Sequence, residues 1–393
     1  MNQAAADHVL VKIACNCREN PMLHLCRLAL TLAAGLASVL ASDHPHHVSW
    51  QGPEGLPGSG KHIVYIANDH EYRAEETLPA LARIMARHYG FTCTFITGVD
   101  PETGYIQKGN GQISGLEVLE SADLLVVGLR FQHWPDEEFQ HLDAYLAAGK
   151  PVIGVRTSTH AFKLSGKYDG PYKKFDWKYK GEDYPFGFGE QVLGEHWVGH
   201  YGKNHEQSSL LKIEAANADH VVLTGVHEPI HVVSGGYTSE VTEADGNTIL
   251  LRGHVLDGMT PDSPPSESKT EKMAVAWLHQ YGPEAGAEPF PTGRVLGTLH
   301  GCSEDILDDG YRRLLVNAHL WCLQMDDAIA ADNPIEFVGG YHPTMFCFGS
   351  GENGPGRLEV KPQDIAGFDT PIYDPEKPIG EPKGKIGREL KTR

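Results

Sequence analysis

Polar side chains capable of proton transfer follow several apolar runs of this 393-residue chain. His70 and Glu71 come shortly after the run "HIVYIAN", and Arg156 and His160 follow the run "PVIGV". His300 comes shortly after the run "GRVLGT". In open α/β sheets the carboxyl ends of parallel strands meet at one edge, and ligands bind there. The sequence therefore predicts that these side chains, carried by separate strands, form one site.

The residue types indicate acid–base chemistry. Histidine titrates near neutral pH, and burial can raise the pKa of a glutamate toward neutrality, so both suit proton transfer. Arg156 cannot act as a base because its guanidinium stays charged, but its forked donors can hold a carboxylate, a phosphate or a developing oxyanion. Ser158 lacks the GxSxG surroundings of a nucleophile elbow. We therefore predict five catalytic residues: His70, Glu71, Arg156, His160 and His300.

The same residues also bear on metal binding. His70, Glu71, His160 and His300 combine imidazole and carboxylate groups, a set that suits zinc or manganese. The sequence leaves open whether a divalent metal is used. Residues 227–231, "HEPIH", match HExxH in form, but that motif needs a helix and here contains a proline. We do not expect a zinc site at this motif.

A long segment from residue 163 to residue 205 is rich in lysine, tyrosine and glycine, as in "KYDGPYKKFDWKYKGEDYPFGFG". Loops of this length in compact domains are usually functional or disordered, and the aromatic residues argue against disorder. The segment is either a lid that stacks on a ring-shaped ligand or a loop that only packs. Sugars fit such surroundings, because their apolar faces stack on rings and their hydroxyls form hydrogen bonds. We predict three substrate-binding residues: Trp134, Thr157 and His200.

Alternating strand and helix patterns must position these residues. Apolar runs at 61–68, 91–97, 123–129 and 151–155 predict buried strands, and residues 75–90 and 135–150 have the apolar spacing of helices. Strand-like runs return at "HVVLTGV", "HVVSGGYTSEV", "NTILLRGHV", "KMAVAWLHQYG" and "GRVLGTLHG", before a closing amphipathic helix at 308–325. This alternation predicts an α/β fold with a doubly wound, mostly parallel sheet and helices on both faces.

The composition narrows the class of partner. The chain has a formal net charge of −19, which argues against nucleic acid and anionic lipid as partners, because both need a basic surface. An apolar content of 40% is enough for a substantial core. We expect a small-molecule ligand, and the sequence does not define an oligomeric state.

The N-terminus indicates export. An apolar run from Leu28 to Leu40 follows Arg27 and is too short for a membrane span, so residues 1–41 are predicted to be a signal peptide, with Met22 as an alternative start. We expect a periplasmic or extracellular protein with no membrane span after cleavage. The next residues, "HPHH" at 44–47, are expected to be flexible and solvated. Four cysteines follow without CxxC spacing, so one disulfide is permitted but no redox or zinc motif is indicated.

Several of these motifs together resemble the ThuA-like (trehalose utilisation) family, within the class I glutamine amidotransferase-like fold. The motifs are "NDHEYR", "GVRTSTHAF", "GEHWVGH", "MAVAWLHQYG" and "GRVLGTLHG…GYRRLLVNAHLW", which span residues 60–326. The resemblance implies a flavodoxin-like α/β domain over that range and leaves residues 333–393 as a Gly/Pro-rich extension. Glutamine amidotransferases carry a nucleophilic cysteine at the turn that here holds Arg156. Amidotransferase chemistry should therefore be absent.

The resemblance also implies a function in disaccharide or keto-sugar metabolism. We expect an exported enzyme that cleaves a saccharide or keto-sugar by hydrolysis or elimination, with His160 or His300 as general acid or base. Glu71 and His70 would assist, and Arg156 would bind an anionic or carbonyl oxygen. Two alternatives remain: a noncatalytic carbohydrate-binding protein that reuses the site, and an envelope scaffold that acts through its C-terminal extension.

Overall fold

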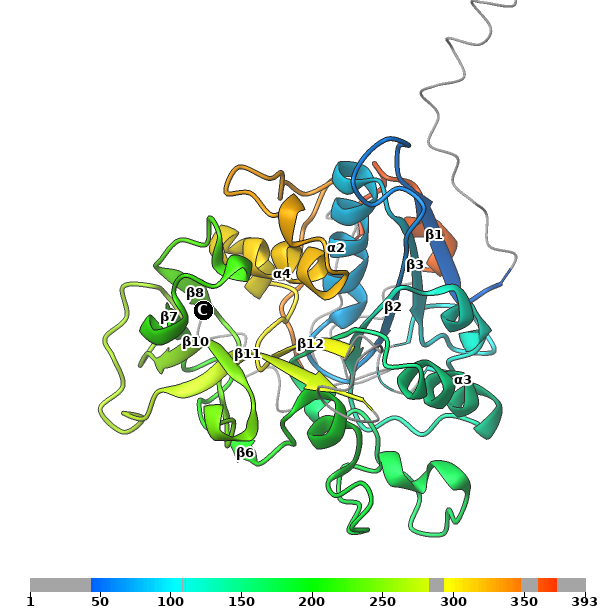
Figure 1. Ribbon diagram of the computed structural model, residues 1–393, viewed down its shortest axis with the longest axis horizontal. Helices are drawn as coiled ribbons and strands as arrows, with labels where there is room; N and C mark the ends of the chain where they lie inside the picture. Colours follow the sequence, from blue (N-terminus) through cyan, green and yellow to red (C-terminus); the bar gives the residue numbers. More distant parts are fainter. Residues whose placement is uncertain (1–43, 108, 110, 283–292, 348–359, 373–393) are drawn as a thin grey trace, which may run out of the picture. The chain divides into compact units, whose positions relative to one another are not determined.

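Ten strands form one mixed sheet in the described residues of the computed structural model, which are 44–107, 109, 111–282, 293–347 and 360–372 (Figure 1). All of them belong to one compact unit, residues 39–393. The sheet order is β1-β3-β2-β4-β5-β12-β11-β10-β7-β8, and β6 and β9 form a separate pair. The strands are β1 His47–Gln51, β2 His62–Asn68, β3 Thr92–Thr97, β4 Leu124–Leu129, β5 Val152–Val155, β6 Gly199–His200, β7 Ser209–Ile213, β8 Ile230–Val232, β9 Tyr237–Thr238, β10 Thr248–Val255, β11 Met273–Tyr281 and β12 Gly293–Thr298.

The α/β character is confirmed, but the expectation of a mostly parallel sheet is not. Five adjacent strands, β3, β2, β4, β5 and β12, run parallel. At one edge β1 joins β3 antiparallel, and beyond β12 the strands β11, β10, β7 and β8 are all antiparallel to their neighbours. The reason is local: no helix lies in the described segment that joins β10 to β11, and antiparallel neighbours, unlike parallel ones, need no crossover helix.

One strand-like run forms no strand at all. "HVVLTGV" lies in a single 3₁₀ turn, Val221–Leu223, whose carbonyl groups face the closing helix. The side chain of Asn317 donates hydrogen bonds to the carbonyl oxygens of Val222 and Thr224, at 3.0 and 2.8 Å. A polar residue of the helix therefore replaces the strand partner that the apolar pattern led us to expect.

Three long helices pack against the sheet: α2 Ala74–Tyr89, α3 Asp136–Ala147 and α4 Asp309–Cys322. Helix α2 packs against β2, β3 and β4, and α4 packs against β5 and β12. Alternate residues of β2 and β4, such as Val64 and Val127, share a different core cluster with Phe139 and Leu142 of α3. Burying a side chain such as Leu142 contributes about 2 kcal/mol. One-turn helices connect the elements, at Leu116–Ser121, Arg156–His160, Pro171–Phe175, Gly189–Leu193, Ala215–Asn217, Glu243–Asp245, Asp305–Leu307, Asp326–Ala328 and Pro362–Ile365.

The segment "HPHH" at 44–47, expected to be solvated, is so only in its first half: His44 is half-buried and Pro45 is exposed, whereas His46 and His47 are buried. His46 and His47 are at most 9% exposed, and β1 extends the sheet beyond β3. The imidazole of His47 lies 3.3 Å from the carbonyl oxygen of Ser114. Apolar Val48 and Trp50 share this short strand and are fully buried, which explains why it joins the core.

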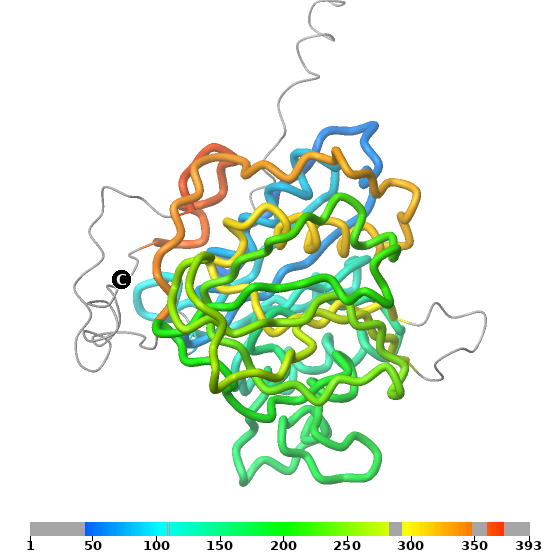
Figure 2. The backbone as a smooth tube through the Cα atoms, turned by 90° about the vertical axis from the view of Figure 1, so that its left-hand side faces the viewer, coloured from blue at the N-terminus to red at the C-terminus, as the bar shows by residue number. Residues whose placement is uncertain are grey.

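The C-terminal residues 333–347 and 360–372 pack onto the layer that contains α2 and α4, drawn orange to red in Figure 2. Arg83 of α2 donates hydrogen bonds to the carbonyl oxygens of Ile365 and Thr370, both at 2.6 Å. Glu76 of the same helix accepts the backbone N–H of Thr344 at 2.8 Å. The described part of the extension is therefore an integral part of this layer.

None of the described helices has the length and apolar composition that a membrane span requires. The predicted signal peptide, residues 1–41, lies outside the described residues. The four described cysteines, Cys93, Cys302, Cys322 and Cys347, are all buried, and the disulfide that the sequence permits does not form among them.

Candidate active site

The carboxyl ends of β2, β4, β5 and β12 bring the predicted residues together around Arg156 and His160. Burial lowers the pKa of His160 well below its usual value, and the charges of Arg130 and Arg156 lower it further, with His200 and His70 also nearby. The fold therefore places Arg130, Arg156, His70 and His200 around His160.

The turn after β2 is held by the buried Asp69. One carboxylate oxygen of Asp69 accepts the backbone N–H groups of Glu71 and Tyr72, at 2.7 and 2.5 Å. The other oxygen accepts the N–H of Ala74 at 2.8 Å, which satisfies one of the free donors at the start of α2. Asp69 thus fixes the backbone that carries Glu71 and begins the helix at the same time.

Glu71 is a buried carboxyl group that can hold or release a proton near neutral pH. Its side chain is 2% exposed, and one of its oxygens accepts a hydrogen bond from the Asn204 amide at 2.8 Å. Burial raises the pKa of Glu71 to about 7, although the charges of Arg156 and Arg130 oppose the rise. A group with this pKa suits general acid or base catalysis at neutral pH.

Arg156 occupies a strained backbone position directly after β5. Its φ of 49° lies in the left-handed region, which non-glycine residues rarely adopt. The guanidinium contacts two rings that are nearly perpendicular to each other, those of Tyr72 and Tyr237, at 4.2 and 4.1 Å from their centroids. It donates to the carbonyl oxygen of Leu299 at 2.6 Å and to the Asn204 side chain at 3.4 Å. Because two rings and two hydrogen-bond acceptors hold the guanidinium, Arg156 acts first as a fixed buried cation.

Aromatic rings surround His160. The ring centroids of Phe131, Trp197 and Tyr237 lie 5.0, 5.1 and 5.9 Å from its imidazole, and that of Trp177 lies at 6.5 Å. Trp177 and Trp197 are only half-buried, so each keeps part of its surface for another molecule. We call these four rings the aromatic wall. Two of them belong to the segment 163–205, whose role as a lid or a packing loop the sequence leaves open.

His200 lies beside this wall, as its assignment to substrate binding requires. Its ring packs edge-on against Tyr237 and Trp197, at centroid distances of 5.3 and 5.7 Å. The β6–β9 pair places it there, because His200 is the direct partner of Tyr237. Burial lowers its pKa, with smaller contributions from Arg156 and Arg130. His200 therefore presents a neutral imidazole at neutral pH.

Two other predicted substrate-binding residues are placed less favourably. Trp134 is 3% exposed and packs in the core against Phe139 and Phe162, at 5.5 and 4.9 Å between ring centroids. It therefore has no surface left to stack on a ligand. Thr157 is 1% exposed, within the one-turn helix that follows β5.

His70 and His300 are the first and the last of the predicted catalytic residues along the chain. Both interact electrostatically with other members of the set, His70 with His160 and His300 with Arg156. The His70 ring lies against Gly109, where a side chain would collide with it. His300 is fully buried, and its Nδ1 lies 2.9 Å from the hydroxyl oxygen of Ser234. Burial lowers the pKa of His300, and Arg156 contributes in the same direction.

The four residues considered as metal ligands, His70, Glu71, His160 and His300, do not form a group whose ligand atoms could share one ion. Within the described ranges, the group whose ligand atoms lie close enough to share an ion is Glu190, Glu195 and His196, all outside the predicted set. His196 Nδ1 lies 2.8 Å from a Glu190 oxygen, which an ordinary ion pair explains. In "HEPIH", residues 230–232 form strand β8, so the two histidines do not share a helix face, as expected.

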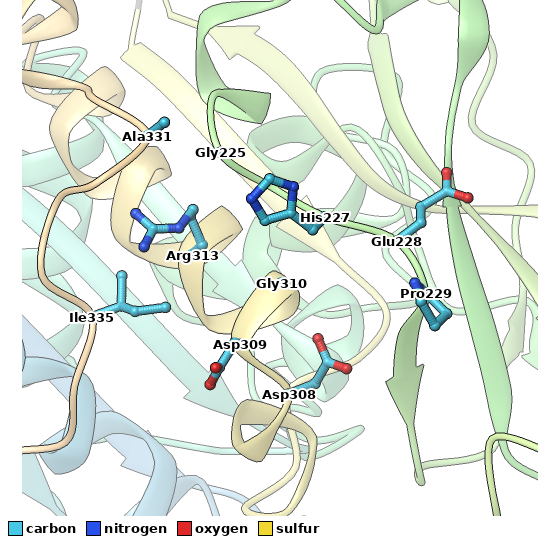
Figure 3. A pocket seen from close by; sticks show the side chains of 10 residues that line it. All are labelled: Gly225, His227, Glu228, Pro229, Asp308, Asp309, Gly310, Arg313, Ala331 and Ile335. Atoms are coloured by element: carbon cyan, nitrogen blue, oxygen red, sulfur yellow. The ribbon is translucent and has the colours of Figure 1, made fainter.

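A separate surface pocket of about 320 Å³ lies at the start of α4 (Figure 3). It is bordered by the loop before β8, by the first turns of α4 and by residues 331–335. Both acidic and basic side chains line this pocket. Several of its polar groups already have hydrogen-bond partners; Asp308, for example, accepts the backbone N–H groups of Tyr311 and His231. None of the predicted site residues lines it; the lining residues are Gly225, His227, Glu228, Pro229, Asp308, Asp309, Gly310, Arg313, Ala331 and Ile335.

Sequence reasoning missed five polar residues that complete the site. Tyr72 and Asp305 could have been found from the sequence, since Tyr72 directly follows Glu71 and Asp305 comes shortly after His300. The other three are Asn204 and Ser234, which lie in loops, and Tyr237, which lies in the two-residue strand β9; no periodicity marks them. These five residues are Tyr72, Asn204, Ser234, Tyr237 and Asp305.

The sequence matches no known family model and no curated protein. Two solved structures described as ThuA-like are similar to this chain. One, from Bacteroides uniformis, has 13% identity and a TM-score of 0.42, and the match covers 70% of this chain and 96% of that one. The other, from Parabacteroides merdae, has 13% identity and a TM-score of 0.40, with 73% and 97% covered. Such scores carry no functional inference, so a function must rest on the site.

Proposed function

We propose that this chain is an exported ThuA-like protein that acts on a saccharide or keto-sugar by acid–base chemistry, through hydrolysis or elimination. One observation carries the proposal: a buried histidine, His160, lies beside the half-buried rings of Trp177 and Trp197. It interacts with the same two cations, Arg156 and Arg130, as the buried carboxyl group of Glu71, whose pKa is about 7. Rings that stack on a sugar face beside groups that transfer protons are the elements such a reaction requires.

Each residue has a distinct role in the proposed reaction. Glu71 transfers a proton, since its pKa of about 7 keeps both forms accessible at neutral pH. His160 and His200 present neutral imidazoles that hydrogen-bond to sugar hydroxyls, while Trp177 and Trp197 stack on the ring. Arg156 supplies positive charge where an oxygen becomes negative. The strand-end turn carries Arg156 and no cysteine, which supports the exclusion of amidotransferase chemistry.

The fold assignment is part of the proposal. The order of the five parallel strands, β3-β2-β4-β5-β12, corresponds to the flavodoxin-like order 2-1-3-4-5. This order supports a class I glutamine amidotransferase-like core, which the antiparallel strands β11, β10, β7 and β8 extend beyond β12.

The test is to incubate the purified protein with disaccharides and their 3-keto forms and to look for new product masses by mass spectrometry. We expect at least one product, with turnover reduced about 10²-fold or more by Glu71→Gln. Glu182→Gln, an exposed change, is the matched control and should leave turnover unchanged. Products that persist in Glu71→Gln would exclude the proposed role of Glu71.

Binding without turnover would favour the noncatalytic alternative. In that case titration calorimetry should detect a sugar that binds the wild type. Trp197→Ala should weaken this binding, because the sugar can no longer stack on the Trp197 ring. Neither products nor binding with any sugar would reject the proposed substrate class.

A further inference from the structure

A buried chain of hydrogen bonds lies behind His300, on the side of its Nδ1 atom. Asp305 is fully buried and its carboxylate accepts five hydrogen bonds. One oxygen accepts the N–H groups of Gly301 and Cys302, at 2.9 and 3.0 Å, and the hydroxyl of Ser234 at 2.6 Å. The other accepts the N–H groups of Val233 and Ser234, at 2.9 and 3.1 Å. A carboxyl group surrounded by donors in this way is ionised.

Counting protons then fixes the state of the imidazole. The Ser234 hydroxyl has one proton, and the charged Asp305 can only accept, so Ser234 donates that proton to Asp305. The same hydroxyl oxygen lies 2.9 Å from His300 Nδ1, where it can now only accept. Nδ1 must therefore carry a hydrogen. A neutral imidazole has a single N–H, so Nε2 is left with an unprotonated lone pair.

This lone pair is buried without a partner. His300 Nε2 has no hydrogen-bond partner among the described residues, although the residue is fully buried. An unsatisfied buried acceptor destabilises the protein, and such atoms call for an explanation. A ligand that donates a hydrogen bond to Nε2 would remove the cost, whereas one that offers only a carbonyl or ether oxygen would not.

We propose that Ser234 and Asp305 are positioning residues that hold His300 as the Nδ1–H tautomer, so that Nε2 selects a substrate carrying a hydroxyl group at one position. This deepens the proposed function and rests on it for the nature of the substrate. It adds a specificity rule: one sugar hydroxyl is required as a donor and cannot be replaced by a ketone, an ether or fluorine. Sites built around such a hydrogen bond discriminate strongly against analogues that lack the donor.

The tautomer can be measured without any substrate, by nitrogen NMR of the full-length protein labelled at histidine. We expect His300 to carry its proton on Nδ1 from pH 6 to pH 8. Ser234→Ala removes the acceptor of that proton and should give a mixture of tautomers. Ser208→Ala is the matched control: Ser208 is also buried and its hydroxyl also joins a histidine, His231, to a second acceptor. It should leave the His300 signals unchanged.

The specificity rule is tested with a series of deoxy and fluoro analogues of whichever sugar is turned over or bound. We expect one position to cost at least about 10²-fold in kcat/KM, or in Kd if there is no turnover, and Ser234→Ala to reduce that discrimination. A proton on Nε2 in the wild type would overturn the proposal, as would an analogue series with no sensitive position. If no sugar is bound at all, the proposed function fails, but the tautomer measurement still decides the role of Ser234 and Asp305.

Discussion

Arg156 illustrates how one buried charge determines the behaviour of its neighbours. It holds the pKa of the Glu71 carboxyl near 7 against a larger effect of burial, and it helps to keep His160 and His300 neutral. The same side chain is held by two rings and two hydrogen bonds. Its position and its charge are therefore both defined by the structure.

Replacing Arg156 with methionine should destabilise the protein strongly. The change leaves Glu71 and Asp305 buried without their nearest shared cation, and breaking a buried ionic arrangement typically costs about 3–5 kcal/mol. Arg156→Lys keeps the charge but loses the guanidinium's forked hydrogen bonds to Leu299 and Asn204, so it should lose less stability than the methionine variant. Denaturant unfolding of the three proteins measures the order. A methionine variant as stable as the wild type would contradict this account of Arg156.

Glu76 gives a second prediction, for pH. Burial raises its folded-state pKa from 4.5 to about 7, although Arg73 lowers it, so the folded state holds this proton to a higher pH than the unfolded chain. Ionisation of Glu76 therefore costs stability as pH rises from about 4.5 through 7, by at most ~3 kcal/mol. Glu76→Gln removes this cost while keeping a partner for Thr344.

The measurement for Glu76 is the difference in unfolding free energy between Glu76→Gln and the wild type. We expect it to shift in favour of the variant between pH 5 and pH 8. The difference is needed because buried histidines such as His319 have lowered pKa values. Their effect on the stability of the protein has the opposite sign, since it destabilises the folded state as pH falls below 6.5. A difference that does not change with pH would show that Glu76 ionises equally in both states.

At the scale of elements, regular segments were predictable and irregular ones were not. The runs that became β2, β3, β4, β5 and β12, with α2, α3 and α4, carry periodic apolar residues and were all placed correctly. Strand β1 was missed because five residues, three of them polar, give a weak pattern. Strand direction was predicted wrongly beyond β12, since apolar periodicity does not encode direction.

The site follows the same division. Residues at the ends of periodic strands, such as Glu71 and Arg156, could be predicted to converge because parallel strands share an edge. Asn204, Ser234 and Tyr237 could not, because the first two lie in loops and the third in a two-residue strand, too short to show a periodic pattern. Trp134 was misplaced because its type suggested stacking, while its side chain faces the α3 core.

The C-terminal layer gives a prediction at this scale. Ending the chain at residue 332 removes the partners of Arg83, of Glu76 and of Arg312, which donates to the carbonyl oxygen of Ile335 at 2.7 Å. We expect a clear fall in the midpoint of thermal unfolding. Ending the chain at residue 372 is the control, since it keeps all of these contacts. If the shorter chain were equally stable and lost only a partner, the scaffold alternative would gain support.

At the scale of the whole molecule, stability does not depend on covalent cross-links among the described residues. Cys93, Cys302, Cys322 and Cys347 are at most 2% exposed and none is paired with another. A reductant should therefore leave the midpoint of thermal unfolding unchanged. Thiol reagents should label these four cysteines only after unfolding, and rapid labelling of the native protein would contradict their burial. The core of the large mixed sheet carries the stability instead.

The position of β12 has a consequence for how the chain folds. It pairs with β5 on one side and with β11 on the other, yet the entire segment between Val155 and Gly293 separates it from β5 in the sequence. Closing so long a loop has an entropic cost before the pairing can compensate, so contacts of this kind form slowly. We expect the two halves of the sheet to acquire structure separately and to join last along β12. Arg156 and His300 lie on opposite sides of that seam, so the site comes into existence only when the join is complete, and the first appearance of ligand binding during refolding would time that event.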